Sequence, residues 1–301
     1  MLPRQILLSW FLLACAGLSM ALPAHAGCEL GGEPIQRLQH WRSSGFPVPD
    51  DAQRNARALA MAACLGDADP FLRDDIAFGA LSGWMRHGQL DTGTLLRIER
   101  ELEDALVAGD ADGFGRPFAA LVLAEIARTD RVQPWMTPQQ RSRMAALAAD
   151  YLRSTRDYRG YVDGEGWRHA VAHGADWVMQ LVLNKALAVP DAMLLLEALA
   201  TQVMPADGHA YVFGESGRLA RPVAYAAARG DLDEAALGAW LEHLATMLGP
   251  MPAAPAQSQW WQRRANLENF LHALGHMLAG EQAPGLVALA ASVDATLAKL
   301  P

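Results

Sequence analysis

Histidine and aspartate recur at helical spacing near the middle of this chain. His169, His173 and Asp176 are four and three residues apart, so on an α-helix they project from one face, within about 60° of one another. Imidazole nitrogens one turn apart, with a carboxylate one turn further on, can ligate a divalent transition metal such as zinc. The same side chains can do acid–base chemistry, with Asp176 orienting His173. The spacing predicts a polar site and leaves metal binding, acid–base catalysis and simple hydrogen bonding to neighbouring helices open.

The segment that leads into this pattern is also rich in polar and aromatic side chains. Glycines surround Asp163 and Glu165 and permit a tight turn, which can bring a carboxylate over the start of the following helix. We therefore add Glu165 to the acid–base candidates. Arg159 can bind a ligand or form a salt bridge with Asp176 or Glu165. The other expected ligand contacts in this segment are Tyr161, Asp163 and Trp167.

A helix over about residues 167–183 is expected to present the His/Asp stripe. Trp167, Gly174, Val178 and Leu181 fall on its opposite side and would supply the packing face. Because the two faces are separate, the pattern favours histidines that line a groove over histidines buried in a core.

Almost every other segment also reads as helix. Apolar residues recur every three or four positions between Gly, Pro and Asp breaks, and alternating strand patterns are not apparent. Thr137-Pro-Gln-Gln140 has the form of a capping box. The expected helices span about 51–65, 70–87, 92–107, 117–128, 137–155, 167–183, 190–204, 219–229, 232–248, 260–278 and 284–300.

Short links between successive helices favour antiparallel neighbours in an all-α fold. We expect an irregular α/α solenoid of HEAT-like repeats, with a closed α/α toroid as the alternative. The longer irregular pieces, 206–216 and 249–259, do not mark a domain boundary, so residues 27–301 are expected to form a single domain.

The first 26 residues have the pattern of a secretory signal peptide. Arg4 precedes an apolar run, and Ala24-His-Ala26 has the A-x-A form of a cleavage site. We expect cleavage near Ala26 and a periplasmic or secreted mature protein. Cys15 and Cys28 both lie in poor lipobox contexts, so lipidation is the less favoured alternative.

The formal charge of the chain is −8, and removal of Arg4 with the leader makes the mature chain one unit more acidic. This balance, without a cluster of basic residues, argues against nucleic acid as a partner. No later stretch approaches the roughly 20 apolar residues of a membrane span. Oligomeric state is left open.

Two cysteines, Cys28 and Cys64, remain after cleavage. In an oxidising compartment they can form a disulfide or stay as separate thiols, and the sequence leaves both open. Two cysteines without a cysteine–histidine cluster exclude a Cys-rich structural zinc site.

The pattern RGY, GW, HA, AH and AD over residues 159–176 resembles DUF2785, a bacterial all-helical family of unknown function. The segments Gly214–Ala220 and Asn266–Leu271 fit the same resemblance, which covers roughly 151–278. It implies a helical fold, a role for His169, His173 and Asp176, and ligand contacts from Glu215 and Arg218. Glu215 and Arg218 are three residues apart, and such a pair is also common at the start of a helix without any ligand. The resemblance supplies no reaction.

Further candidates are weaker. His209 lies on the irregular piece 206–216, and His272 and His276 form a second HxxxH pair with Glu268 one turn earlier. Tryptophans 135, 260 and 261 are expected to serve packing. Two functions follow: a binding protein that recognises a peptide, a partner or a cell-envelope component, and a hydrolase acting on envelope polymers through a metal or an acid–base set. The repeat-like build, without a nucleophile motif, favours binding.

Overall fold

The computed structural model describes residues 28–253 and 258–301, and the predicted leader lies outside them. Within these residues the fold is all-α, with one two-stranded sheet. The helices are η1 (Glu29–Gly32), α1 (Ile35–Ser43), α2 (Asp51–Ala63), η2 (Phe71–Phe78), α3 (Gly79–Arg86), α4 (Thr92–Val107), α5 (Gly115–Val132), α6 (Pro138–Ser154), α7 (Ala170–Val182), α8 (Val189–Val203), α9 (Glu215–Ala228), α10 (Glu234–Leu248), α11 (Ser258–Leu278) and α12 (Pro284–Ala298). The strands are β1 (Tyr161–Val162) and β2 (Gly166–Trp167).

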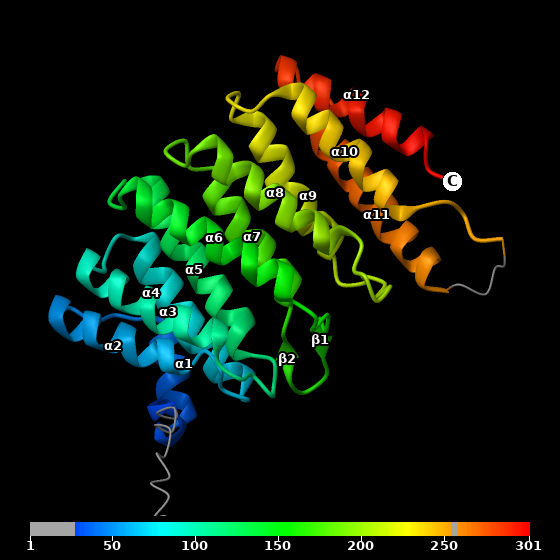
Figure 1. Ribbon diagram of the computed structural model, residues 1–301. Helices are drawn as coiled ribbons and strands as arrows, with labels where there is room; N and C mark the ends of the chain where they lie inside the picture. The colour runs from blue at the N-terminus through cyan, green and yellow to red at the C-terminus, as the bar shows by residue number, and fades with distance from the viewer. Residues whose placement is uncertain (1–27, 254–257) are drawn as a thin grey trace, which may run out of the picture.

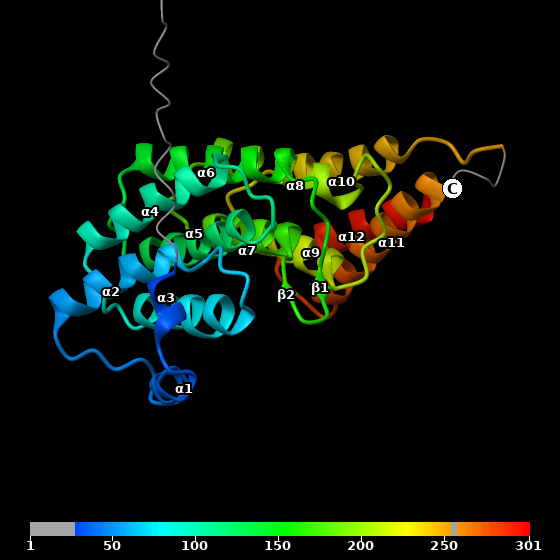
Figure 2. The same cartoon turned by 90° about the horizontal axis from the view of Figure 1, so that it is seen from below.

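The helices stack in two layers. Figure 2 shows α4, α6, α8 and α10 in one layer and α5, α7, α9, α11 and α12 in the other. Within the layers, α6 packs on α8, α5 on α7, α7 on α9 and α9 on α11. Helices α2 and α12 lie at opposite ends (Figure 1), so the described helices form an open array and not the alternative closed toroid. The HEAT-like repeat and the single domain over 27–301 stay predictions.

Several helix boundaries follow directly from local sequence. Asp50 accepts a hydrogen bond from the Gln53 backbone N–H at 2.8 Å and caps α2. Helix α4 spans 92–107, as predicted. The predicted capping box forms at the start of α6, where Thr137 and Gln140 bond each other's backbone N–H groups.

Two of the predicted helices differ from the structure at their start in ways that bear on the hairpin and α7. The helix expected over 70–87 begins with the π-helical turns of η2 and becomes α-helical only at Gly79. The helix expected over 167–183 begins three residues late, at Ala170, because Trp167 belongs to β2 and His169 has a left-handed backbone. The predicted packing face, which placed Trp167 and Val178 on the same side of one helix, is therefore wrong.

Helix α7 lies in the middle of the array. Residues 170–178 are all buried, and α7 packs on α5, α6, α8 and α9. Small residues allow this close packing: a Cβ added at Gly174 would come within 2.6 Å of the Leu152 side chain on α6. The sequence favoured a groove-lining His/Asp stripe, and this prediction is wrong, because neighbouring helices cover both sides of α7.

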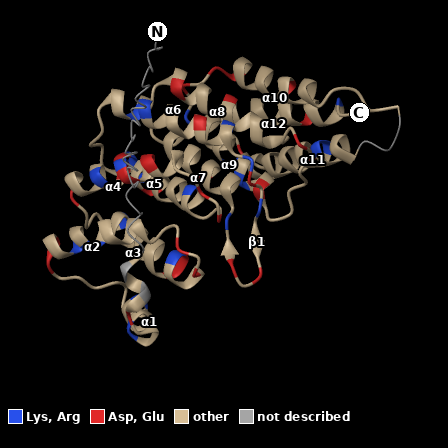
Figure 3. Ribbon diagram, turned by 60° about the horizontal axis from the view of Figure 1, so that its bottom comes forward, with Lys and Arg blue, Asp and Glu red and all other residues tan. Residues whose placement is uncertain are grey.

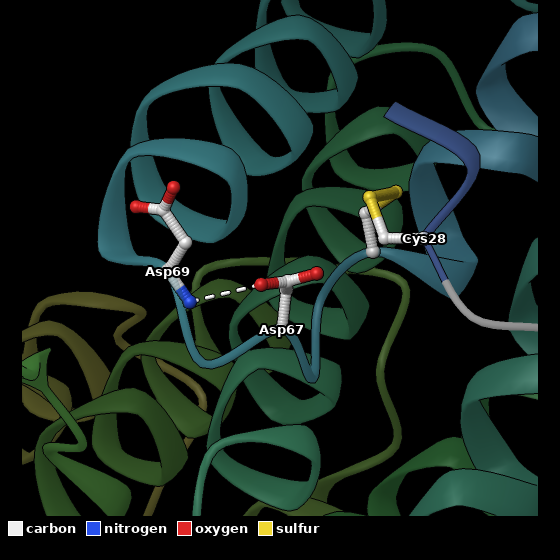
Figure 4. Close-up of a disulfide and its surroundings, with 4 residues drawn as sticks. Cys28, Asp67 and Asp69 are labelled. Atoms are coloured by element: carbon white, nitrogen blue, oxygen red, sulfur yellow. Dashed lines mark hydrogen bonds between the residues drawn. A yellow bond between two sulfur atoms is a disulfide. The ribbon is translucent and has the colours of Figure 1, made fainter. Parts of the chain in front are cut away.

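A disulfide joins Cys28 to Cys64 across a sequence separation of 36 residues. It ties the start of the described chain to the end of α2, beside the loop in which the Asp67 carboxylate accepts a hydrogen bond from the Asp69 backbone N–H (Figure 4). Of the alternatives left open by the sequence, the structure has the bonded pair. Among the described residues, no helix is both long and apolar enough to cross a membrane.

Candidate functional site

A β-hairpin projects from one edge of the array just before α7 (Figure 1). Its strands pair antiparallel, with Tyr161 opposite Trp167 and Val162 opposite Gly166. Tyr161 and Trp167 therefore lie on the same face and form a cross-strand aromatic pair, with ring centroids 5.2 Å apart. Gly164 in the turn has φ +81°, a conformation that glycine adopts without strain.

The hairpin is anchored on the buried guanidinium of Arg73 in η2. Nη2 of Arg73 donates to the Glu165 carbonyl oxygen at 2.9 Å, and Nε donates to the Asp74 carboxylate at 2.7 Å. The fit is tight, because a Cβ on Gly166 would lie 2.9 Å from Nη2. Two guanidinium groups contact the Phe114 ring: the carbon of the Arg73 group lies 3.9 Å from the ring centroid and that of Arg168 4.1 Å.

His169 links the hairpin to α7. Its φ of +54° is in the left-handed region, which is uncommon for residues other than glycine. The Trp167 indole lies on its imidazole, with centroids 4.4 Å apart and planes 22° apart. Nε2 donates to the Phe213 carbonyl oxygen at 3.2 Å and lies 3.8 Å from the Glu215 carboxylate. Burial lowers the pKa of His169, and Glu215 opposes this shift.

Glu215 is itself buried, with 2% of its surface exposed. Its carboxylate accepts a hydrogen bond from the Phe213 backbone N–H at 2.9 Å, at the N-terminus of α9 where the helix dipole favours negative charge. This contact shapes the loop before α9. The Phe213 ring lies directly over Gly160, where an added Cβ would come within 2.0 Å of it. Phe213 was not singled out from the sequence; its only signal there is its place in the irregular piece 206–216.

His173 faces α5 in the interior. Nδ1 donates to the Pro117 carbonyl oxygen at 3.1 Å, and the ring packs edge-on against Phe118 with centroids 5.3 Å apart. The pKa of His173 is lowered to about 3, mainly by burial and to a smaller extent by the nearby His169. A neutral, enclosed imidazole of this kind supports packing and does not exchange protons readily near neutral pH.

Asp176 is held by Arg218 on α9. Nη1 of Arg218 lies 2.7 and 2.5 Å from the two carboxylate oxygens. Burial raises the pKa of Asp176, and the Arg218 charge opposes that shift. The structure thus joins two residues that the resemblance had suggested separately, as a salt bridge between α7 and α9.

These contacts disagree with the predicted zinc-type site. The ring centroids of His169 and His173 are 6.0 Å apart, so the two histidines are neighbours. Each donates through one ring nitrogen to a backbone carbonyl, and the Asp176 oxygens are engaged by Arg218. In the described part of the chain, no three His, Cys, Asp or Glu side chains are grouped to hold a metal ion.

The polar residues of the hairpin region pair locally. Arg159 bonds the carboxylate of Asp157 at 2.9 Å and not Asp176 or Glu165. The Glu165 carboxylate accepts from Arg168 at 2.6 Å, so it does not reach over the start of α7. Asp163 is exposed at the tip of the hairpin, where Figure 3 shows acidic residues in red.

Several large apolar side chains on the hairpin and on the loop before α9 are exposed to solvent. Tyr161 is 45% exposed, Trp167 37% and Phe213 41%, and Trp167 packs edge-on against both of the other rings. The neighbouring Val212 is 74% exposed. We call these four residues the hairpin surface. Large side chains exposed together in this way are typical of binding sites.

The remaining candidates do not join the hairpin surface. His209 stacks on Tyr158 at a centroid distance of 5.2 Å. His272 and His276 are exposed on α11, where Glu268 pairs with Arg264. Trp260 is buried and Trp135 is half-buried, as expected for packing, whereas Trp261 is 41% exposed.

Comparison with known proteins gives one match. The family model described as "Protein of unknown function (DUF2785)" covers residues 105–275, a range that includes the hairpin, α7 and the loop before α9. The family match begins at residue 105, whereas the motifs alone indicated a start near residue 151. Searches of curated proteins and of solved structures gave no match.

Proposed function

This chain belongs to the DUF2785 family, and we propose that it is a secreted binding protein whose hairpin surface holds a peptide of a partner or of the cell envelope. The observation that carries this proposal is the exposure of three aromatic rings from two separate segments, Tyr161 and Trp167 from the hairpin and Phe213 from the loop before α9. Aromatic side chains of this kind dominate the energetics of binding sites.

His169 and Glu215 lie beneath the rings and support this function by holding them in place. His169 stacks on Trp167, and its imidazole donates to the Phe213 carbonyl oxygen. Glu215 fixes the Phe213 backbone. The two segments that carry the rings are therefore held by one set of contacts, so little conformational entropy is lost when a ligand binds.

The hydrolase alternative has less support from the same contacts. An acid–base set must converge on a point that a substrate can reach. His173 is enclosed against α5, and Asp176 is paired with Arg218. Glu165 points to Arg168. We therefore propose that these three residues stabilise the fold around the hairpin and α7.

A peptide array tests the proposal. Purified protein should bind a distinct subset of the peptides, and Trp167→Ala and Tyr161→Ala should each weaken that binding at least about tenfold, as expected for central aromatic contacts. Trp261→Ala and Tyr225→Ala are matched controls, because Trp261 is 41% and Tyr225 42% exposed on other helices. Equal losses in all four variants, or no peptide bound above background, would overturn the proposal.

A further inference from the structure

A pocket of about 310 Å³ opens beside the hairpin surface, between the start of η2 and the hairpin. We call it the hairpin pocket. Two hairpin glycines contribute to its wall, and the side chains that line it are those of Pro70, Phe71, Asp74, Asp75, Tyr161 and Trp167. Three are aromatic, two are carboxylates and none is basic.

We propose that the hairpin pocket binds the cationic side chain of a lysine or arginine in a peptide ligand. This inference rests on the proposed function, because the pocket shares Tyr161 and Trp167 with the hairpin surface. Aromatic rings attract an ammonium or guanidinium group through their quadrupole, and nearby carboxylates add charge complementarity.

The carboxylates lie on the η2 side of the pocket. Asp74 bonds Arg73 through Oδ1, while Oδ2 lies toward the hairpin, 3.5 Å from the position of an added Cβ on Gly166. Arg73 is fully buried, with its other donors on the carbonyl oxygens of Asp67 and Glu165. The Arg73 guanidinium therefore lies behind the wall of the pocket, where it joins η2 to the hairpin.

Asp75 already has a cationic partner. Nη2 of Arg42, from α1, lies 2.8 Å from the Asp75 carboxylate, and the two side chains are 51% and 38% exposed. Ion pairs as exposed as this one are weak, so a ligand cation can displace Arg42. The Arg42–Asp75 pair thus shows that a guanidinium group can bind the Asp75 carboxylate at the wall of the hairpin pocket.

Titration calorimetry with hexalysine tests the inference. Hexalysine should bind, and hexalysine acetylated at every side chain should bind at least about tenfold more weakly, since it keeps the chain but lacks the charge. Asp75→Asn and Tyr161→Ala should each weaken hexalysine about two- to fivefold. Arg42→Gln should strengthen it by a similar factor, because that substitution frees the Asp75 carboxylate.

A charge control separates the pocket from the general acidity of the protein. Asp104→Asn removes an exposed carboxylate from a different pocket next to the disulfide, which has five carboxylates and no aromatic ring. This variant should bind hexalysine as the wild type does. Equal weakening in Asp104→Asn and Asp75→Asn, or weakening in Arg42→Gln, would overturn the inference.

The two proposals fail in different ways. Array peptides that bind through Trp167 without any dependence on lysine or arginine would overturn the cation pocket and leave the proposed function intact. The absence of any peptide binding, together with no hexalysine binding, would overturn both. Circular dichroism and the melting temperature of each variant confirm that a loss of binding is not a loss of fold.

Discussion

The indole of Trp167 lies nearly flat on the imidazole of His169, with ring centroids 4.4 Å apart. This contact joins an exposed side chain to a buried one, since Trp167 is 37% exposed and His169 only 9%. The indole therefore shields one face of the imidazole from solvent. His169 also has a left-handed backbone, which turns the chain from the hairpin into α7.

Trp167→Ala should raise the pKa of His169. Burial is the main cause of its lowered pKa, and removal of the indole admits water that stabilises the imidazolium ion. NMR titration of the imidazole carbon-bound protons measures the shift. Trp261→Ala, at a site of similar exposure on α11, should leave the pKa unchanged. An unchanged His169 titration in Trp167→Ala would mean that the indole does not shield the ring.

His173 should make the protein less stable in acid. Its pKa is about 3 in the folded protein and 6.5 in a free chain, so below pH 6.5 the unfolded state binds the extra proton. The stability that His173 contributes is present above pH 6.5 and is lost as pH falls toward 3, by up to about 1.4 kcal/mol per unit. Urea unfolding at several pH values measures this slope.

His173→Asn supplies the comparison for that slope. The amide can still donate to the Pro117 carbonyl oxygen but does not titrate, so the slope between pH 6.5 and 3 should become shallower even if the variant is less stable overall. His272→Gln, on the exposed face of α11, should keep the wild-type slope. An identical slope in His173→Asn would show that other groups cause the acid sensitivity.

The helices could be predicted because their signals are local. Asp50 and Thr137 cap the helices that begin directly after them. The helix over 92–107 can be predicted from its own apolar spacing, without knowledge of what packs against it. The hairpin could not be predicted in the same way, because strands of two residues show no alternation. Its one local signal is the Asp-Gly-Glu-Gly run between Val162 and Trp167, which also fits an ordinary loop.

The site depends on contacts that cross long stretches of sequence. The polar residues around His173 stand out in the sequence, but their burial comes from α5 and α9 and is not visible in α7 alone. Arg218 and Asp176 are 42 residues apart. Asp130 gave no signal at all, yet it accepts hydrogen bonds from Arg141, Asn184 and two backbone N–H groups.

Removing one partner of the Asp176–Arg218 pair should destabilise the fold. Arg218→Ala leaves the Asp176 carboxylate buried without its cation, which costs about 3–5 kcal/mol when both partners are fully buried. Arg218 is 34% exposed, so we expect about 2–3 kcal/mol. The double variant Asp176→Asn, Arg218→Ala should recover part of this loss, since the charge is gone.

Acid gives a second readout of the same pair. Burial raises the pKa of Asp176, so the folded protein binds its proton more readily than the unfolded chain. Without Arg218 this preference should grow, and Arg218→Ala should lose less stability in mild acid than at neutral pH, relative to the wild type. Additive losses at every pH in the double variant would show that the pair is not coupled.

Reduction of the disulfide should release the N-terminal part of the described chain first. The bond closes a loop with a sequence separation of 36 residues, worth about 4 kcal/mol on the chain-entropy model. Few residue pairs hold α1 to the rest of the fold, mainly on η2. Cys28→Ser with Cys64→Ala should therefore lower the melting temperature and speed proteolysis between 28 and 50, while the array from α4 to α12 stays protected. Limited proteolysis with mass spectrometry identifies the cuts. If cuts appear first in the hairpin or the loop before α9, the disulfide stabilises the site and not the terminus.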